Sequence, residues 1–376
     1  MVHIINSFAN EGKCLILCGT FALSSSNRKV YDENDYLMRW TFQSASKSFA
    51  GARKQWDDLN RASSNHVLLD SDFVEPLLKH FGDDGVVLGV RNGNSDPGMA
   101  LLQRKSTGVW QTFQPSQAPL GLIQLGHADD TGAEMQEITR ELPGYALQLS
   151  VLQQDPDYTS FPQPKISGAV EPLDYIQTAR ITLSGTFEEY WKARGSNLRH
   201  NLARRRRRMT EQGYALTLNA VRDPAQVADA IHDYGVLEAK GWKSREGTAV
   251  TADNAQGRFY RDVFERFCAR GQAAIYQLRL NDRLAATDLC LIQNGMFIIL
   301  KTAYEEELNE FSPAFLMREE VMKELCANKQ MRSIEFYGRV MEWHTRWSNE
   351  IRTMYHLTCY RHPWVKSLRK VAKRFA

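Results

Sequence analysis

The sequence predicts an α/β protein with an α+β mixed sheet, and three observations in the second half of the chain carry that prediction. Three apolar runs separated by turn residues predict adjacent strands over residues 274–280, 284–293 and 296–304. Asn294-Gly295, between the last two runs, is the strongest short-range signal for a β-hairpin. Ser312-Pro313 then predicts a helix that ends near Ala327, because serine suits the N-cap and proline the first helical position.

Length and charge indicate two parts with different electrostatic character. The chain has 376 residues and 43% hydrophobic content, enough for a folded core and, at about 150 residues per domain, for two domains. Residues 1–175 carry 14 Lys and Arg against 21 Asp and Glu, and residues 176–376 carry 33 against 23. The net charges are therefore −7 and +10, so a polyanionic partner is expected to meet the second half.

The cysteines and the apolar runs indicate the cellular location of the protein. Six cysteines are scattered, and Cys14 and Cys18 lack a second ligand pair, so no metal site is expected and the thiols are interpreted as buried and reduced. The apolar run 14–23 is too short to cross a membrane and lacks the basic flank of a signal peptide. We therefore expect a cytoplasmic protein with no transmembrane segment.

The first half alternates predicted helices and strands. Helices are expected over Ala50–Ala62, over Ser71–Phe81 with Ser71 as its cap, and over Glu134–Leu142. Strands are expected over residues 85–91, 98–105, 109–115, 120–125 and 145–152. Four prolines between Gln154 and Pro172 indicate a linker rather than a helix. The predicted division is an N-terminal extension of uncertain structure (1–45), a first lobe (46–155), a proline-rich linker (156–177), a second lobe (178–362) and a basic tail (363–376).

The second lobe opens with a predicted strand over 179–183 and one long helix from Phe187 to about Gln212. Leu198, Leu202 and Met209 form an apolar stripe on this helix, and five consecutive arginines, Arg204 to Arg208, interrupt it. Five successive residues point in every direction around a helix, so at least one arginine must lie near the buried stripe. The arginine run has two interpretations. It is either a solvent-exposed helix face, on which the aliphatic parts of the side chains pack while the guanidinium groups reach water, or a contact for phosphate or a tRNA backbone.

The remaining elements complete the alternation. They are a strand over 214–221, helices over 224–240 and 258–270, a strand over 332–338, a helix or loop over 343–350 and a strand over 354–361. The tail would place Trp364, Leu368, Val371 and Phe375 on one face of a basic helix. Such a tail can dock on anionic lipid, on nucleic acid or on its own domain, and docking on its own domain is the expectation.

Four phrases carry a resemblance to a known family. They are LRHNLARRRRRM (198–209), Gly241-Trp242-Lys243, KTAYEEELNEFSPAFL (301–316) and IEFYGRV (334–340). In this order they resemble the CelD-like branch of the GNAT superfamily of acyltransferases, which is related to the Fem peptidyltransferases. The resemblance implies two tandem GNAT-like lobes, the first one degenerate, and an enzyme that moves an acyl group from acyl-CoA to a primary amine of an unidentified acceptor.

Two alternatives stay open beside that function. One is a Fem-like enzyme that takes its acyl group from aminoacyl-tRNA. It is favoured by the arginine run, by the charge of the second half and by the absence of a glycine-rich phosphate loop in NEFSPAFL (309–316). The other is a catalytically inactive interaction module. No Walker lysine loop, zinc spacing or GxSxG elbow occurs, so hydrolase and kinase functions are disfavoured.

Acyl transfer needs a neutral amine, a polarised carbonyl and a proton for the leaving group, which directs attention to ionisable residues at strand ends. Asp288 lies inside an apolar strand. It is either a base or an anchor for the substrate amine, or else a structural carboxylate paired with an arginine. Tyr304, at the end of the third strand, is a candidate acid for the leaving group or a hydroxyl that binds the acceptor. The remaining catalytic candidates are Glu335, Tyr337 and His344, with packing or capping as the alternative for His344.

Binding residues complete the set. The donor is expected to contact the helix start and the middle strand through Ser312, Ala314, Phe315, Leu289 and Leu291. Substrate is expected to contact Trp242, Lys243, Arg205 and Lys301. Two positions depart from the family pattern. Ala314 replaces the glycine common in Ser-Pro-Gly, and His344 stands where a lysine is frequent.

Overall fold

The computed structural model describes residues 39–91, 97–126, 130–166, 168–240 and 250–372, with side chains up to residue 368 in the last range. Met38–Ala376 form one unit. The predicted extension 1–45 lies largely outside these residues, but its end already belongs to the first strand. None of the helices in the described ranges is long and apolar enough to cross a bilayer.

The first half contains the predicted helices and strands together with β1 and η2, which the sequence did not predict. Its elements are β1 (Trp40–Ser44), α1 (Ala45–Ala62), η2 (Val67–Leu69), α2 (Ser71–Phe81), β2 (Val86–Arg91), β3 (Gly98–Ser106), β4 (Val109–Thr112), β5 (Ile123–Leu125), α3 (Thr131–Glu141) and β6 (Gln148–Gln154). The expected cap of α2 is wrong by one residue: Asp70, not Ser71, accepts from the Asp72 N–H. Ser71 instead donates its own N–H and hydroxyl to Asp57.

The second half follows the predicted order with one break. Its elements are β7 (Val170–Thr182), α4 (Phe187–Lys192), α5 (Ser196–Glu211), β8 (Leu216–Val221), η3 (Pro224–Gln226), α6 (Val227–Lys240), α8 (Ala255–Ala269), β9 (Ala273–Leu280), β10 (Arg283–Gln293), β11 (Met296–Tyr304), η4 (Glu306–Phe311), α9 (Pro313–Ala327), β12 (Ser333–Phe336), α10 (Glu342–Trp347), β13 (Glu350–Tyr360) and α11 (Pro363–Ala372). The expectation of one helix from Phe187 to Gln212 is wrong. Gly195, a poor helix former, is the N-cap of a second helix.

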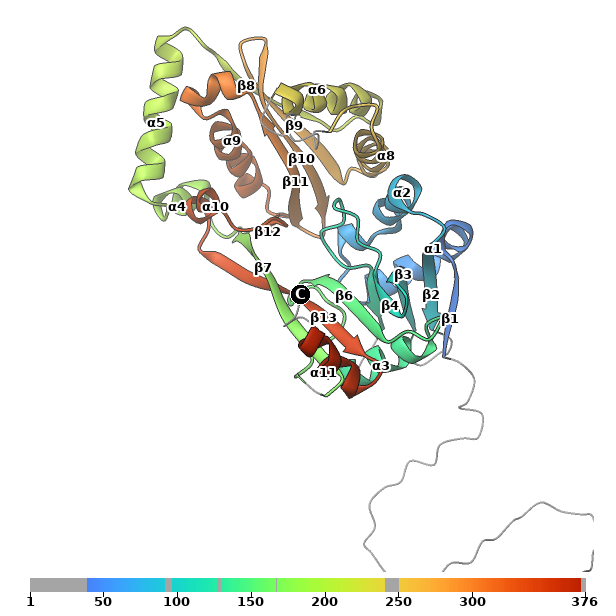
Figure 1. The fold of residues 1–376 in the computed structure, drawn as a ribbon. Coiled ribbons are helices and arrows are strands. Elements are labelled where there is room, and N and C mark those ends of the chain that lie inside the picture. The colour runs from blue at the N-terminus through green and yellow to red at the C-terminus, as the bar shows by residue number, and fades with distance from the viewer. Residues whose placement is uncertain (1–38, 92–96, 127–129, 167, 241–249, 373–376) are drawn as a thin grey trace, which may run out of the picture. The chain divides into compact units, whose positions relative to one another are not determined.

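All thirteen strands belong to one sheet, in the order β1-β2-β3-β4-β6-β13-β7-β12-β11-β10-β9-β8 with β5 beside β3. Most neighbours are antiparallel, while β4–β6 and β11–β12 are parallel. The structure therefore confirms the mixed α/β class. Strand β7 begins at Val170, inside the predicted linker 156–177, and with β13 it joins the strands of the two halves (Figure 1). The lobe boundaries themselves stay a prediction.

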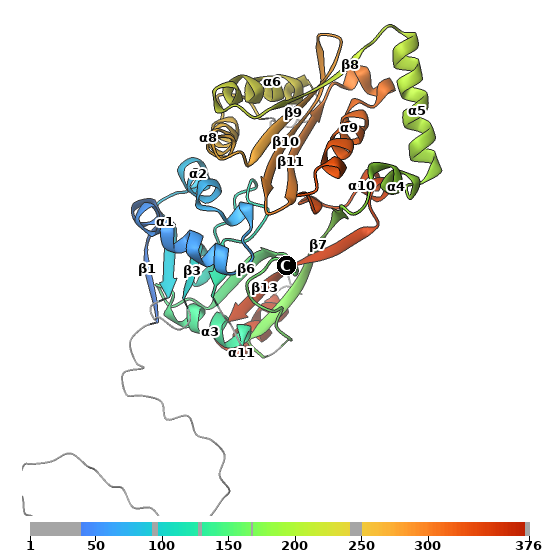
Figure 2. The ribbon, with the colours of Figure 1, turned by 180° about the vertical axis from the view of Figure 1, so that it is seen from behind.

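Helices cover both faces of the second half of the sheet, as Figures 1 and 2 show from opposite sides. One buried cluster includes Val227 of α6 and Phe264 of α8, together with Leu289 and Leu291 of β10. The other includes Leu198 of α5 and Leu316 of α9. Strand β10 therefore alternates between two cores, with Leu289 facing one and Cys290 the other.

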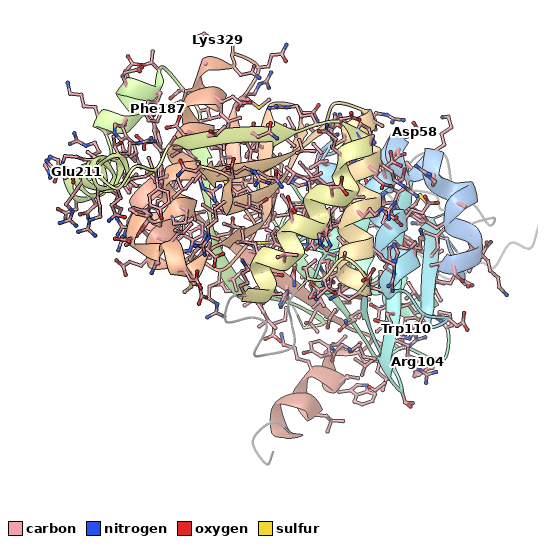
Figure 3. All side chains as sticks on the ribbon, turned by 90° about the horizontal axis from the view of Figure 1, so that it is seen from above. Asp58, Arg104, Trp110, Phe187, Glu211 and Lys329 are labelled. Carbon is pink, nitrogen blue, oxygen red and sulfur yellow. The ribbon has the colours of Figure 1, made fainter. Side chains whose placement is uncertain are left out.

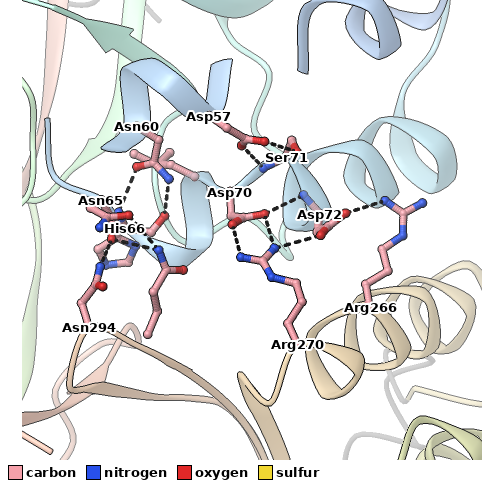
Figure 4. Close-up of polar contacts among 12 residues, drawn as sticks. Asp57, Asn60, Asn65, His66, Asp70, Ser71, Asp72, Arg266, Arg270 and Asn294 are labelled. Atoms are coloured by element: carbon pink, nitrogen blue, oxygen red, sulfur yellow. Dashed lines mark hydrogen bonds and ion pairs between the residues drawn. The ribbon is translucent and has the colours of Figure 1, made fainter. Parts of the chain in front are cut away.

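Ion pairs join α2 of the first half to α8 of the second (Figure 4). Arg270 binds both Asp70 and Asp72 at 2.8 Å, and Arg266 binds Glu75 at 2.6 Å. Asn294, in the β10–β11 turn, donates to the Asn65 carbonyl. The two halves of the chain are thus held together by side chains as well as by the shared sheet.

Candidate active site

The site begins where two parallel strands part. Strand β12 pairs with β11 only from Met296 to Ile298. The rest of β11, Ile299–Tyr304, continues without β12 beside it, and α9 begins just after β11 and η4. A helix start facing a gap between strands offers free N–H groups and the positive end of the helix dipole.

A β-bulge in β11 determines which face of the sheet the side chains at the end of this strand point to. Leu289 of β10 pairs with Lys301, whereas the next residue, Cys290, pairs with Ile299, so Leu300 is the extra residue. A bulge shifts the alternation of the side chains that follow it. Thr302 consequently reaches Asp288 on the face covered by α9, and Tyr304 lines a pocket on the same side.

Two adjoining pockets meet at the start of α9. The first, of about 330 Å³, is lined by the β11 end, the α9 start and the aromatic face of α10: Thr302, Tyr304, Asn309, Ser312, Pro313, Ala314, Phe315, Arg318, Trp343 and Trp347. The second, of about 540 Å³, is polar and lies toward α5; its lining includes Arg194, Asn197, Asn201, Arg205 and Arg346. Ser312 and Phe315 line both. The predicted Ser312, Ala314, Phe315, Tyr304 and Arg205 are therefore brought together.

Ser312 differs from the expected capping serine. Its backbone is left-handed, with φ of 51°, and its side chain caps no N–H of α9. Its carbonyl instead accepts from the N–H groups of Phe315 and Leu316. Because Pro313 has no N–H, Ala314 provides the first free N–H of the helix, and it lies in the wall of the pocket.

Arg205 supplies positive charge beside this helix start. Burial and the neighbouring Arg204, Arg346 and Arg208 lower the pKa of Arg205. Its one hydrogen bond among the described residues is long, 3.5 Å to the Asn309 carbonyl, with no carboxylate there to neutralise it. An anion in the pocket would relieve this repulsion.

The other arginines of the run have carboxylate partners or face solvent. Arg206 binds Glu319 at 2.7 Å, Arg208 lies 3.4 Å from Glu310, and Arg207 lies 3.5 Å from Glu211. Figure 3 shows side chains radiating around α5, whose end is labelled Glu211. Arg207 and Arg208 therefore fit the solvated-face interpretation, and a phosphate contact stays a prediction for Arg205.

Asp288 forms a buried ion pair at the edge of the smaller pocket. Its Oδ2 lies 2.9 Å from Nη1 of Arg318, and the two side chains are 0% and 3% exposed. Thr302 donates its hydroxyl to the same carboxylate. Burial raises the pKa of Asp288, although Arg318 and Thr302 oppose that shift. Only Arg318 and Thr302 of this group line the pocket, so the geometry favours a structural carboxylate that positions Arg318.

Glu335 and Tyr337 lie elsewhere, in a buried polar network between the two halves. Glu335 binds Arg180 at 2.6 Å and Arg352 at 2.8 Å. Tyr337 shares a 2.8 Å hydrogen bond with Nε2 of His66, a residue of the first half. Burial lowers the pKa of His66 to about 3 and raises that of Tyr337 well above its usual value. Neither Glu335 nor Tyr337 lines the two pockets at the α9 start.

His344 caps and packs. Its Nδ1 accepts the Met341 N–H at 2.9 Å, and its ring stacks on Trp343 with centroids 3.5 Å apart. Burial lowers its pKa to about 4, so the ring is neutral at pH 7. The geometry fits the capping alternative, and the catalytic assignment of His344 stays a prediction.

Three predicted binding residues lie on the opposite face from α9. Leu289 and Leu291 belong to the core beneath α6 and α8. Lys301 is the cross-strand partner of Leu289, and partners in an antiparallel pair share a face. Trp242 and Lys243 lie outside the described residues. For these five, the donor and substrate assignments stay predictions without support from the pockets.

Sequence reasoning missed several residues that line the pockets. Arg346 and Trp347 belong to α10, a segment expected only as a helix or loop, and Arg318 lies in a helix interpreted as apolar. The signal for Arg318 was the unpaired Asp288 in an apolar strand, which demands a cation. Within the described part of the chain, no group of three or more His, Cys, Asp or Glu residues is arranged to hold a metal.

Comparisons with known proteins agree with this geometry. Residues 196–345, which include β11, α9 and the start of α10, match the acetyltransferase (GNAT) domain family. A crystal structure of FemX is similar in fold at 10% identity, covering 84% of this chain and 97% of that one with a TM-score of 0.52. The crystal structure of a conserved protein of unknown function from Bacteroides thetaiotaomicron is also similar in fold. The match covers 82% of this chain and 97% of that one at 8% identity, with a TM-score of 0.50. No curated protein matches.

Proposed function

We propose that the chain is a GNAT-type acyltransferase, as the domain match over residues 196–345 supports, and that it takes its acyl group from acyl-CoA and delivers it to a primary amine. The observation that carries the proposal is the meeting of two pockets at the α9 start. One is polar and rich in arginine, as the phosphates of coenzyme A require. The other is smaller, has four aromatic residues in its lining and reaches the strand end, as a pantetheine arm with its thioester requires.

Arginine replaces glycine in this phosphate site. A glycine-rich loop binds phosphate through backbone N–H groups, and here the helix start contributes mainly the N–H of Ala314 because Pro313 has none. Arg205 and Arg346 line the same pocket and offer forks that match phosphate oxygens. The missing glycine loop therefore weakens the acyl-CoA assignment less than the sequence suggested.

Tyr304 is our candidate for the proton donor. In the proposed reaction the neutral amine attacks the thioester carbon and a C–N bond forms while the C–S bond breaks. The departing thiolate takes a proton from Tyr304, and the proton that the nitrogen loses to solvent balances it when Tyr304 is protonated again. The Tyr304 side chain is 40% exposed and lines the smaller pocket beside Thr302 and Pro313. A hydroxyl there would meet the sulfur of a thioester that enters along α9.

Binding of acetyl-CoA to matched arginine variants tests the donor. Arg205→Ala should weaken binding by about tenfold or more, since a hydrogen bond to a charged group contributes about 1.5–3 kcal/mol. Arg207→Ala is the control, because Arg207 lies on the same helix but pairs with Glu211 and lines neither pocket. Equal affinity in both variants, or no binding to the unmodified protein, would reject the acyl-CoA assignment.

The arginine run and the net charge of +10 after residue 175 favour one second candidate, transfer from aminoacyl-tRNA. Affinity for tRNA should fall steeply with salt, because phosphate contacts release counterions, whereas affinity for acetyl-CoA should fall much less. Titrating both donors at low and at high salt separates the two enzymes. If neither binds, the interaction-module alternative takes first place.

A further inference from the structure

The C-terminal helix exposes apolar side chains that its own domain does not cover. Among the described large hydrophobic residues, the three with the highest exposed fractions are Ile166 at 70%, Tyr145 at 62% and Leu368 at 60%, and Trp364 follows at 56% together with Met341. Leu368 and Trp364 lie one helical turn apart on α11, so they share a face.

Contacts place Tyr145 beside this face. The Tyr145 hydroxyl lies 3.5 Å from Nε2 of His362, and the His362 ring stacks on Trp364 with centroids 5.8 Å apart. Together, Tyr145, Trp364 and Leu368 form what we call the α11 patch. A cluster of exposed apolar side chains marks an interaction surface more often than isolated ones do.

The tail was expected to dock on its own domain, and a face of α11 other than that of Trp364 and Leu368 makes this contact. Lys366 lies 3.7 Å from Glu171 of β7 and is only 11% exposed, so this side of the helix packs against the sheet. Trp364 and Leu368 point away from that contact. The side chains of Val371 and Phe375, expected on the same face, lie outside the described ones.

Charge identifies what could cover the α11 patch. Residues 361–376 contain six Lys and Arg, one His and no Asp or Glu. An apolar face with tryptophan, flanked by basic residues, matches the amphipathic helices that lie in the plane of a membrane interface. Each basic residue near an anionic surface adds to the attraction, which salt screens.

We propose that α11 docks the protein on an anionic lipid surface through the α11 patch, with the basic sequence 361–376 supplying the electrostatic attraction. A second copy of the chain would bring the same six basic residues and repel the first. Nucleic acid would satisfy the basic residues but would leave Leu368 in water. Lipid headgroups and acyl chains together satisfy both kinds of residue.

Docking would leave the candidate active site open. In both Figure 1 and Figure 2, α11 lies at the end of β13 that is remote from α5 and α9. The proposal therefore does not depend on the donor assignment, and lipid binding and acetyl-CoA binding can be measured separately on one preparation.

Co-sedimentation with vesicles tests the proposal. We expect the full chain to bind vesicles that contain phosphatidylglycerol and to bind pure phosphatidylcholine at least tenfold more weakly, with the difference shrinking at high salt. Trp364→Ser/Leu368→Ser should lose about tenfold or more in affinity for the anionic vesicles. Val236→Ser, which removes an apolar side chain that is 46% exposed on α6, should bind as the unmodified chain does.

Three outcomes would overturn the proposal. They are equal binding to both vesicle types, undiminished binding by the Trp364→Ser/Leu368→Ser variant, and displacement of the protein from anionic vesicles by RNA at equal phosphate concentration. The last outcome would assign the tail to nucleic acid. Unchanged melting temperatures of both variants control for folding, as expected for side chains that are more than half or nearly half exposed.

Discussion

Replacing Glu335 by glutamine tests whether this carboxylate holds the fold together or takes part in transfer. Glu335 is 0% exposed and pairs with two cations, Arg180 and Arg352, whose side chains are 22% and 11% exposed. It also accepts from the hydroxyls of Tyr158 and Ser333. Glutamine keeps the size, but it removes the charge and turns an amide N–H₂ toward a guanidinium.

The expected loss is about 3 kcal/mol in the free energy of unfolding. Breaking a buried ion pair costs about 3–5 kcal/mol. The lower end applies here because both arginines keep a second carboxylate: Asp155 lies 2.6 Å from Arg352, and Asp157 lies 3.0 Å from Arg180. Asp157→Asn is the matched control. Its carboxylate binds the same Arg180 but is 44% exposed, so about 1 kcal/mol or less should be lost.

Urea unfolding followed by tryptophan fluorescence measures both variants against the unmodified chain. A midpoint for Glu335→Gln no lower than that of Asp157→Asn would refute the buried-network argument. If stability held while acetyl transfer fell, Glu335 would return as a catalytic candidate.

Three further predictions concern the other ionisable residues. Asp288→Asn should lower the unfolding midpoint, because Arg318 would keep a buried charge without its carboxylate, and adding Arg318→Met should restore much of the loss; an unchanged midpoint for the single variant would contradict this. Tyr304→Phe should leave the melting temperature unchanged and slow thiol release from acetyl-CoA in the presence of an amine, whereas normal release would remove Tyr304 from the mechanism. His66 has a pKa lowered to about 3, so its contribution to stability should be complete above pH 6.5 and be lost as the pH falls from 6.5 toward 3; His66→Gln should flatten that acid limb of the stability profile, although His344 keeps part of it.

The sequence was sufficient to predict the elements whose structure depends on residues within the same short segment. Helix α2 occupies the predicted Ser71–Phe81, and the strands around Asn294-Gly295 form the predicted hairpin. Asn294 takes the positive φ that such a turn requires. The break at Gly195 was also a local signal, but the apolar stripe that follows it, from Leu198 to Met209, favoured one continuous helix.

Pairing between distant residues explains what the sequence could not predict. The Glu335 network joins residues of β7, β12 and β13 to Asp155, and the His66–Tyr337 hydrogen bond spans 271 positions. No spacing rule relates such residues, so Glu335 and Tyr337 could be noticed as ionisable but could not be placed. Ser312 shows the same limit, because its left-handed backbone is set by the preceding turn η4 rather than by its own preference.

The helical periodicity of α5 could have predicted which arginine of the run faces the protein. Leu198, Leu202 and Met209 are buried in α5, and steps of four, three and four along a helix return to one face. Arg205 completes that series between Leu202 and Met209. It must therefore lie on the side of α5 that faces the protein, and there it lines the larger pocket beside the start of α9. Among the described residues, Arg204 and Arg205 are the two arginines of the run without a carboxylate partner. Of these two, Arg205 is the one that the apolar stripe places against the protein, as an anion site requires.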